Sequence, residues 1–229
     1  MARSVDEFLK LSKEFSANSY NLYLVGGSVR DLLIKKAIED FDLATDATPE
    51  EMSKFLEGCD LTFAKYGAVK IKRGKHYFVI TTFRKEGKYD DSRHPSKIKF
   101  VRDMKIDCKR RDFTINGLYM DDHFKLYDYV GGEQDIKDKV IRLIGFFKTK
   151  RIKEDPLRIL RAARFALRFN YTIDPKLIKI IKKHASLLTK LNPEKIKEEL
   201  GKFGEVNEKK KEILFNELNI SKYLKDMLK

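Results

Sequence analysis

The stretch Leu22–Asp46, LYLVGGSVRDLLIKKAIEDFDLATD, combines an apolar run, two adjacent glycines and two alternating carboxylates. Its first four residues predict a short buried strand, and Gly26-Gly27 predicts the turn that ends it. The following residues, SVRDLLI, predict a helix with Ser28 and Asp31 near its start. Because glycine has no side chain and the first N–H groups of a helix are unpaired, a phosphate can approach this junction closely.

The two carboxylates, Asp40 and Asp42, alternate with apolar residues over positions 39–43. This is the pattern of a strand with one apolar and one polar face, so Asp40 and Asp42 are expected on the same face. Two neighbouring carboxylates repel each other, and a cation between them removes the repulsion. Mg²⁺ prefers such oxygen ligands and completes its shell with water and substrate phosphates. The stretch therefore predicts a magnesium site beside a phosphate-binding turn.

The order G-G-x-V-R-D followed by D-x-D resembles the catalytic motif of the class II tRNA nucleotidyltransferase and bacterial poly(A) polymerase family. This family belongs to the polymerase β-like superfamily. The resemblance implies that Asp40 and Asp42 are the catalytic residues and hold Mg²⁺. It also implies that Gly26, Gly27 and Arg30 bind the nucleotide.

The fold implied by the resemblance is an α+β head with a polymerase β-like mixed or antiparallel sheet, followed by an all-α neck and body. We expect the catalytic head at residues 1–145, and a helical neck with a short RNA-binding body at residues 146–229. An antiparallel meander is predicted from the strand-like runs at 61–64, 67–74 and 76–84. Helices are predicted at 4–15, 48–58, 154–168, 175–184, 193–202, 206–218 and 220–228.

The strand that ends in T-T-F-R often carries a third acidic residue in related enzymes. Here the strand reads Tyr77-Phe78-Val79-Ile80, without a carboxylate. Three interpretations stay open: two acids suffice, another group such as Asp112 helps, or the site is weakened.

The polar run RKEGKYDDSRHP, at residues 84–95, predicts a mobile surface loop. Relatives that add both C and A carry a flexible loop here, whereas relatives that add only CC tend to have a shorter one. The resemblance therefore favours an enzyme that adds A.

The second motif, IDCKRRDFTINGLYMD at residues 106–121, combines basic and ribose-binding side chains. Arg111 can neutralise phosphates, and Asp112 and Asn116 can bond ribose hydroxyls. On a helix, Asp112 and Asn116 would share a face. The run resembles the family motif R-R-D-F-T-x-N-A, with Gly117 in place of alanine, and this implies that Arg111, Asp112 and Asn116 bind the nucleotide.

The third motif, EDPLRILRAARFALR at residues 154–168, predicts an amphipathic helix with a stripe of arginines and resembles the family motif E-D-x-x-R-x-x-R. Cytosine and adenine each present an amino donor beside a ring-nitrogen acceptor, which Asp155 and Arg158 can match. Uracil and guanine would leave a polar group unpaired, at a cost of roughly 1–3 kcal/mol. The resemblance implies that Asp155 and Arg158 read the base, assisted by Arg161 and Arg164.

The formal net charge of the chain is +14, which favours polyanionic partners. From Arg151 onward the sequence holds 20 basic and 11 acidic residues, so the C-terminal part is the more basic. Cys59 and Cys108 have no metal-ligand spacing and are typical of reduced thiols in a cytoplasmic protein. No signal-peptide core or membrane-spanning run is found, so we expect no membrane partner.

The resemblance implies a template-independent RNA nucleotidyltransferase that adds C and A from CTP and ATP to the 3′ end of tRNA. The reaction would be Mg²⁺-dependent two-metal nucleotidyl transfer. An A-adding enzyme, a CC-adding enzyme and a poly(A) polymerase stay open within the family. Two other classes are a catalytically weak RNA-binding module and a small-molecule adenylyltransferase, which would not need the Asp155–Arg158 helix.

Family members usually continue into further helical domains that hold the tRNA, so we expect a C-terminally short member. A homo-oligomer is one way to supply the remaining grip on the tRNA.

Overall fold

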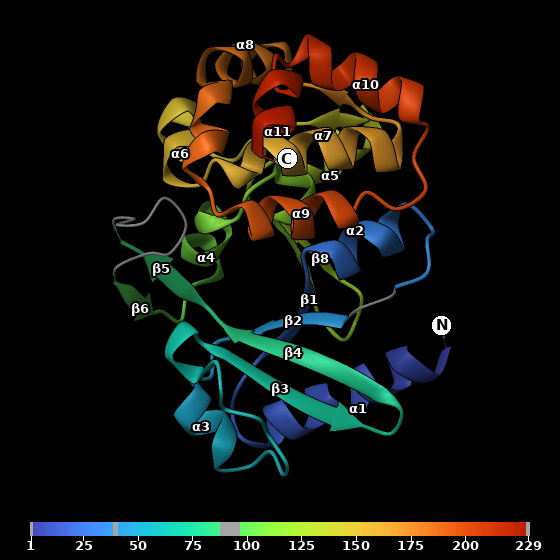
Figure 1. The fold of residues 1–229 in the computed structure, drawn as a ribbon. Coiled ribbons are helices and arrows are strands. Elements are labelled where there is room, and N and C mark those ends of the chain that lie inside the picture. The colour runs from blue at the N-terminus through green and yellow to red at the C-terminus, as the bar shows by residue number, and fades with distance from the viewer. Residues whose placement is uncertain (1, 39–40, 88–96, 228–229) are drawn as a thin grey trace. The chain divides into compact units, whose positions relative to one another are not determined.

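The fold is described from a computed structural model of the chain, over residues 2–38, 41–87 and 97–227 (Figure 1). The chain divides into a first compact unit, within residues 1–87 and 97–133, and a second, which includes residues 134–229. The domain boundary expected after residue 145 stays a prediction. Within the described ranges, no helix combines the length and the apolar character needed to cross a membrane.

The first unit is built on a six-stranded sheet with the order β3-β4-β2-β1-β7-β8. Only β2 and β4 run parallel to each other, and every other pair of neighbours is antiparallel. The mixed sheet predicted for an α+β head is therefore confirmed. The strands are β1 (Leu22–Val25), β2 (Phe41–Thr45), β3 (Ala68–Arg73), β4 (His76–Thr82), β7 (Leu118–Met120) and β8 (Leu126–Asp128).

The alternation in β2 places its apolar side chains in the core. Phe41 and Leu43 are buried, whereas Asp42 between them is exposed. Phe41 packs against Phe78 of β4, with ring centroids 5.5 Å apart. Because register fixes which face each side chain takes, burial of the two apolar residues holds the Asp42 carboxylate on the open face of the sheet.

The remaining elements of the first unit cover the sheet and its edges. The strand predicted at 61–64 is wrong, because residues 61–63 form a turn that leads into a 3₁₀ helix at Ala64–Tyr66. Only Asp60, just before them, makes an isolated bridge, to Lys70. The helix predicted from Thr48 to near Gly58 ends at Ser53, where Phe55 turns inward to pack edge-on against Phe15. The remaining elements of the first unit, outside the six-stranded sheet, are α1 (Ala2–Ala17), α2 (Gly27–Leu33), α3 (Pro49–Ser53), η1 (Ala64–Tyr66), β5 (Arg84–Glu86), β6 (Ile98–Phe100), α4 (Met104–Arg110) and η2 (Thr114–Asn116).

The second unit is helical apart from a two-stranded parallel sheet of β9 (Val140–Ile141) and β10 (Thr172–Ile173). Its centre is α7 (Leu157–Phe169), whose residues Ile159, Leu160 and Ala163 are fully buried. The predicted all-α character of this part is confirmed with that small addition. The other helices are α5 (Gly132–Lys137), α6 (Lys148–Glu154), α8 (Pro175–His184), η3 (Ala185–Lys190), α9 (Pro193–Gly201), α10 (Glu208–Glu217) and α11 (Ser221–Met227).

The helix predicted at 154–168 is split near its start. Glu154 is the last residue of α6, and α7 begins at Leu157. Asp155 between them is extended, with φ −147° and ψ 90°. The residue before a proline is biased away from the helical conformation, so Pro156 separates the two helices.

Candidate active site

Three charged side chains of the first unit converge on the glycine junction between β1 and α2. A Cβ atom at Gly26 would lie 3.7 Å from Arg111 Nη1 and 4.0 Å from Asp42 Oδ2. At Gly27 it would lie 3.4 Å from Arg30 Nη2 and 3.9 Å from Asp42 Oδ2. The structure thus brings one carboxylate and two guanidinium groups around a backbone that carries no side chain.

Gly26 is glycine for a conformational reason as well. Its φ of +63° and ψ of −124° lie in a region that L-residues with a side chain rarely adopt. This conformation turns the chain from the buried strand β1 directly into α2. The junction is fixed further because the Asp42 N–H donates to Ser28 Oγ, at 2.9 Å.

Asp42 is the predicted metal ligand that the structure describes, and its carboxylate is exposed on the sheet face beside the glycines. Asp40, the other predicted ligand, lies outside the described residues, so its position on the same face stays a prediction. Among the residues that the structure describes, no group of three His, Cys, Asp or Glu side chains is placed to hold a metal ion. The carboxylate oxygens of Asp42 fit a hard divalent cation, which takes its other ligands from water and substrate phosphates.

Val79 occupies the position beside Asp42 on the neighbouring strand β4. On the far side of Val79, strand β3 presents Lys70. The row Asp42, Val79, Lys70 therefore offers one carboxylate and one ammonium group, and the structure gives the place beside Asp42 to an apolar side chain.

Arg30 and the second sequence motif form one polar network. Arg30 Nη1 donates to Asn116 Oδ1 at 2.6 Å, and Asn116 Nδ2 donates to Asp112 Oδ1 at 3.1 Å. Arg30 Nε also donates to Asp31 Oδ1, at 2.9 Å. These hydrogen bonds connect residues of α2 and η2 around the glycine junction.

Asp112 and Asn116 were predicted to share a face of an α-helix, and this prediction is wrong because no α-helix contains them. α4 ends at Arg110, Arg111 is extended, and Asn116 closes the 3₁₀ turn η2. The chain turns inward here because Phe113 is fully buried. The two polar side chains still meet, because the 3₁₀ turn brings Asn116 back to Asp112.

Asp107 of α4 is a buried carboxylate that the sequence analysis missed. Its Oδ2 accepts from Arg111 Nη2 at 3.1 Å and from the Tyr119 hydroxyl. Its Oδ1 accepts from Arg110 Nε at 2.8 Å and from the Arg84 N–H at 2.9 Å. Tyr119 OH also accepts from Arg111 Nε, at 2.9 Å. Arg111 is thus held in place by a carboxylate and a phenol on one side, with its Nη1 beside Gly26.

The pKa of Asp107 reflects this environment. Burial alone would raise the pKa, but the charges of Arg111 and Arg110 and the hydrogen bond from Tyr119 hold it at about 2. Burial raises the pKa of the Tyr119 hydroxyl, which therefore stays protonated. The spacing Asp107, Arg110, Arg111 puts the carboxylate one turn before both arginines, and this i, i+3, i+4 pattern is the signal by which Asp107 was detectable.

In the second unit, Asp155 and Arg158 lie one turn apart at the start of α7. Arg158 Nε is 3.7 Å from Asp155 Oδ2, and Arg158 Nη1 donates to the Arg151 carbonyl at 2.5 Å. The Arg158 side chain is buried, with the residue 4% exposed, and its Nε has no hydrogen-bond acceptor among the described residues. Asp155 also accepts from the Leu157 N–H, at 3.2 Å. A carboxylate and a guanidinium are thus held side by side on a fixed backbone.

The other two arginines of the predicted stripe have different surroundings. Arg164 Nε donates to Glu199 Oε1 of α9 at 2.6 Å, and its guanidinium lies 4.3 Å from the centre of the Phe165 ring. Arg161 lies over the same ring, at 5.4 Å. The Arg164–Glu199 pair joins α7 to α9 and is buried. A contact of Arg161 or Arg164 with nucleotide stays a prediction.

The loop predicted at 84–95 is wrong for its first three residues, and its mobility stays a prediction. Arg84–Glu86 form β5, which pairs with β6. Residues 88–96 lie outside the described residues.

Comparison with known proteins agrees with the geometry of the first unit. The family model of the poly A polymerase head domain matches residues 22–142, just over half of the chain. The chain belongs to the poly A polymerase head domain family. The matched range contains the glycine junction, Asp42, Asp107 and Arg111. Nucleotidyltransferases of this family generally use divalent metal ions.

The individual relatives of this chain include CCA-adding enzymes. The chain is 37% identical over 194 residues to the CCA-adding enzyme of Listeria monocytogenes, covering 83% of this chain and 49% of that protein. The solved CCA-adding enzyme of Bacillus stearothermophilus in complex with CTP is similar with a TM-score of 0.78 and 33% identity, over 85% of this chain and 47% of that one.

A third relative is the Thermotoga maritima CCA-adding enzyme complexed with tRNA, with a TM-score of 0.76 and 27% identity over 94% of this chain and 50% of that one. The chain therefore spans about half the length of the relatives it matches.

Proposed function

We propose that this chain is a template-independent RNA nucleotidyltransferase that adds C and A from CTP and ATP to the 3′ end of tRNA. The observation that carries the proposal is the convergence of the Asp42 carboxylate with Arg30 and Arg111 on the glycine junction. The relatives' names and complexes with CTP and tRNA support this choice of substrates. Such a tRNA-processing enzyme would act in the cytoplasm.

The first unit would bind the triphosphate. Gly26 and Gly27 leave the backbone accessible, and Arg30 and Arg111 can make charge-assisted hydrogen bonds to phosphate oxygens. Asp107 and Tyr119 orient Arg111 by binding the opposite edge of its guanidinium, with Nη1 left beside Gly26. Asp112 and Asn116, linked to each other at 3.1 Å, are placed to bind the ribose.

The reaction joins the RNA 3′ oxygen to the α-phosphorus of the nucleotide and releases pyrophosphate. Asp42, together with Asp40, would hold the divalent ions, for which we propose Mg²⁺ because of the all-oxygen ligands. Bound there, the ions would neutralise the triphosphate and lower the pKa of the attacking hydroxyl. The residues of the chain contribute position and charge, which is most of what phosphoryl transfer needs.

The second unit would select the base. Asp155 can accept from the amino group of cytosine or adenine, while Arg158 donates to the adjacent ring nitrogen. Arg158 Nε is buried 3.7 Å from Asp155 Oδ2, so the two side chains would be held next to each other when they bind the base. Arg161 would assist, and Arg164 would contribute at least by fixing α7 to α9 through Glu199.

The test is incubation of the 229-residue chain with tRNA transcripts that lack part or all of the 3′ CCA, with labelled CTP or ATP. We expect divalent-ion-dependent addition, and a loss of at least about 100-fold in Asp42→Asn, which removes a metal ligand. Asp6→Asn is the matched control, because Asp6 is an exposed aspartate on α1. No addition by the unaltered chain, or full activity in Asp42→Asn, would refute the proposal.

Product length separates the alternatives within the family. A CC-adding enzyme extends the transcript by two residues, an A-adding enzyme extends only a transcript that ends in CC, and a poly(A) polymerase also extends oligo(A). A catalytically weak RNA-binding module would bind tRNA in a salt-sensitive way without divalent ions and extend none of these ends.

A further inference from the structure

Phe146 and Phe147, just before α6, are the most exposed large apolar side chains among the described residues. Phe146 is 100% exposed and Phe147 is 78% exposed. Their backbone is fixed, since the Phe146 carbonyl accepts from the Lys148 N–H at 3.0 Å and the Phe147 carbonyl from the Arg151 N–H at 3.1 Å. Two adjacent aromatic rings are therefore presented to solvent on an ordered turn, and none of the three motifs of the proposed active site contains them.

The surface that continues from this pair is basic. α6 and α8 lie side by side, joined where Lys148 Nζ binds Asp174 Oδ2 at 2.8 Å. At the end of α8, burial and then the charges of Lys153 and Lys183 lower the pKa of His184. The exposed lysines of the two helices are Lys150, Lys153, Lys176, Lys179, Lys182 and Lys183.

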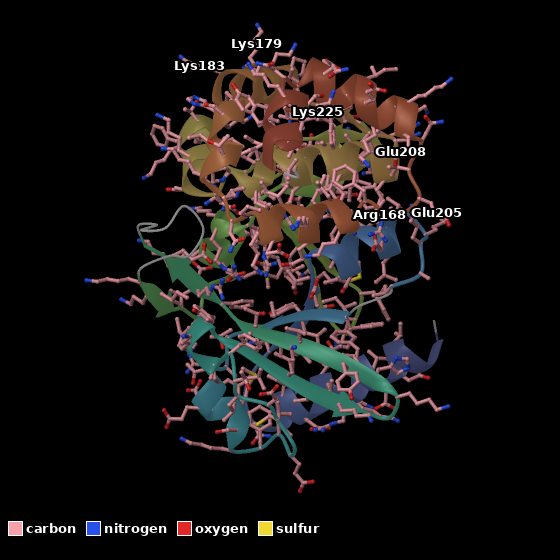
Figure 2. The ribbon with its side chains drawn as sticks, in the orientation of Figure 1. Arg168, Lys179, Lys183, Glu205, Glu208 and Lys225 are labelled. Carbon is pink, nitrogen blue, oxygen red and sulfur yellow. The ribbon has the colours of Figure 1, made fainter. Side chains whose placement is uncertain are left out.

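Few acids oppose this charge. α8 contains no acidic residue, and Asp174 before it is buried against Lys148. Glu154 of α6 lies 3.6 Å from Arg151 and 3.8 Å from Lys150. Lys179 and Lys183 project outward from α8 in Figure 2. The surface therefore carries a net positive charge next to two exposed aromatic rings.

This combination fits nucleic acid better than protein. Exposed aromatic rings stack on unpaired bases, and adjacent lysines follow the phosphate backbone. A protein interface needs about 800 Å² on each partner, and its core is depleted in lysine. Two phenylalanines surrounded by lysines provide neither that apolar area nor that composition.

The distance between Phe147 and the proposed base-reading pair, Asp155 and Arg158, also suits a short single-stranded RNA segment. The seven residues of α6 lie between Phe147 and Asp155, which are therefore eight positions or about 12 Å apart at 1.5 Å per residue. Stacked nucleotides are about 3.4 Å apart along a strand, so this length spans roughly three of them. Both positions belong to the second unit.

We propose that Phe146, Phe147 and the lysines of α6 and α8 form a binding surface for a single-stranded RNA segment, with an unpaired base stacked on the phenylalanines. The inference deepens the proposed function and rests on its RNA substrate, because it assigns the segment just before the 3′ end to this surface. Gly145, with φ +91°, shapes the turn that presents the two rings.

The test is fluorescence anisotropy with a labelled, unstructured RNA oligonucleotide, and with tRNA that ends in CC and so has a single-stranded 3′ segment, in EDTA and without nucleotide. We expect Phe146→Ala/Phe147→Ala to weaken binding about 5- to 100-fold, the effect of losing one stacked base. Phe146→Trp/Phe147→Trp should keep the affinity, because stacking needs an aromatic ring. Ile213→Ala is the matched control, since Ile213 of α10 is also apolar and 67% exposed, and it should bind as the unaltered chain does.

A second variant tests the lysines. Replacement of Lys150, Lys153, Lys179 and Lys183 by alanine should lower the slope of log K against log salt by about 0.7 for each lost phosphate contact, so by roughly 3. The double phenylalanine variant should leave this slope unchanged, because it removes no charge.

The outcomes separate this surface from the proposed catalysis. Unchanged RNA affinity in Phe146→Ala/Phe147→Ala would overturn the inference. If light scattering of that variant also showed a shift from dimer to monomer, the phenylalanine pair would be a self-association site instead. Binding that depends on the phenylalanines, in a chain that extends no 3′ end, would support the surface while the proposed nucleotidyltransferase function fails.

Discussion

Val79 lies directly beside Asp42 in the parallel register of β2 and β4, so the two side chains share the open face of the sheet. Lys70 follows Val79 on β3. An apolar side chain therefore stands next to the proposed metal ligand, where the resemblance to the family led us to look for a third carboxylate. Asp42 and Asp40 would therefore bind metal with fewer protein oxygens than a site that also had a carboxylate at position 79.

Val79→Glu should increase the affinity for divalent metal. We expect the concentration of Mg²⁺ that gives half-maximal nucleotide addition to fall about threefold to tenfold, or ~0.7–1.4 kcal/mol. The gain is limited because Lys70 lies on the other side of the new carboxylate. Val79→Gln is the control for size and polarity. Equal Mg²⁺ requirements in the two variants would show that a carboxylate at position 79 contributes nothing to metal binding.

Gly26→Ala should impair both folding and nucleotide binding. Its backbone conformation costs an alanine roughly 1–3 kcal/mol, and the added methyl group would stand between Arg111 and Asp42. Gly74→Ala is the matched control, because Gly74 also has a positive φ, of 58°, but nothing lies within 4 Å of its Cβ position.

Urea-induced unfolding and equilibrium binding of CTP measure the two effects. Gly74→Ala should lose about 1 kcal/mol of stability and keep its affinity for CTP. If Gly26→Ala also kept its affinity for CTP, the glycine junction would not be the site of the triphosphate.

Asp107→Asn should reduce the free energy of unfolding at pH 7 by roughly 3 kcal/mol, because it leaves the buried charge of Arg111 without its carboxylate. The pKa of Asp107 is lowered to about 2 in the folded chain, so its ionisation stabilises the fold above the unfolded pKa of about 3.9. This contribution disappears as the pH falls from about 4 to 2.

The measurement is urea unfolding of both proteins at pH 7, 5, 4 and 3. The stability difference between the two proteins should be constant from pH 7 to about pH 5 and shrink below it. A difference that stays constant down to pH 3 would contradict the lowered pKa of Asp107.

Arg158→Lys should relax the choice of base. Lysine keeps the charge but cannot present the planar donor edge of the guanidinium beside Asp155. We expect the preference for CTP over UTP, measured as a ratio of kcat/KM, to fall about 10- to 100-fold, which corresponds to roughly 1–3 kcal/mol of lost discrimination.

Arg168→Lys, at the exposed end of the same helix, is the control and should keep the preference (Figure 2). A preserved CTP-to-UTP ratio in Arg158→Lys would remove Arg158 from base recognition.

Local sequence patterns were sufficient where one short segment decides its own structure. The run Leu22–Val25 forms β1 with the predicted bounds, and Pro175–His184 forms α8 likewise. Alternation and capping residues are local signals, so they predict an element without knowledge of the residues that pack against it in the tertiary structure. The inward burial of Phe41 and Leu43, which leaves Asp42 on the open face, follows from the same period of two.

Other features failed because they depend on partners distant in the chain. Residues 61–64 have a strand-like composition but form no strand, because only Asp60 makes an isolated bridge to β3 at this edge of the sheet. Asp112 and Asn116 meet through a 3₁₀ turn rather than an α-helix, because burial of Phe113 redirects the backbone. The ion pair of Arg164 with Glu199, 35 positions away, was not predicted either, because the local spacing of the arginines carries no information about a partner on α9.

The sequence by itself determined the family, the strand and helix of the glycine junction, and the residue types that a nucleotidyltransferase needs. The tertiary structure decided which groups act on which: it set Val79 beside Asp42, and it fixed Arg111 between Asp107 and Tyr119. The physical reason is that strand order and the pairing of buried charges are determined by the packing of the whole core, whereas periodicity and capping are determined within a few residues.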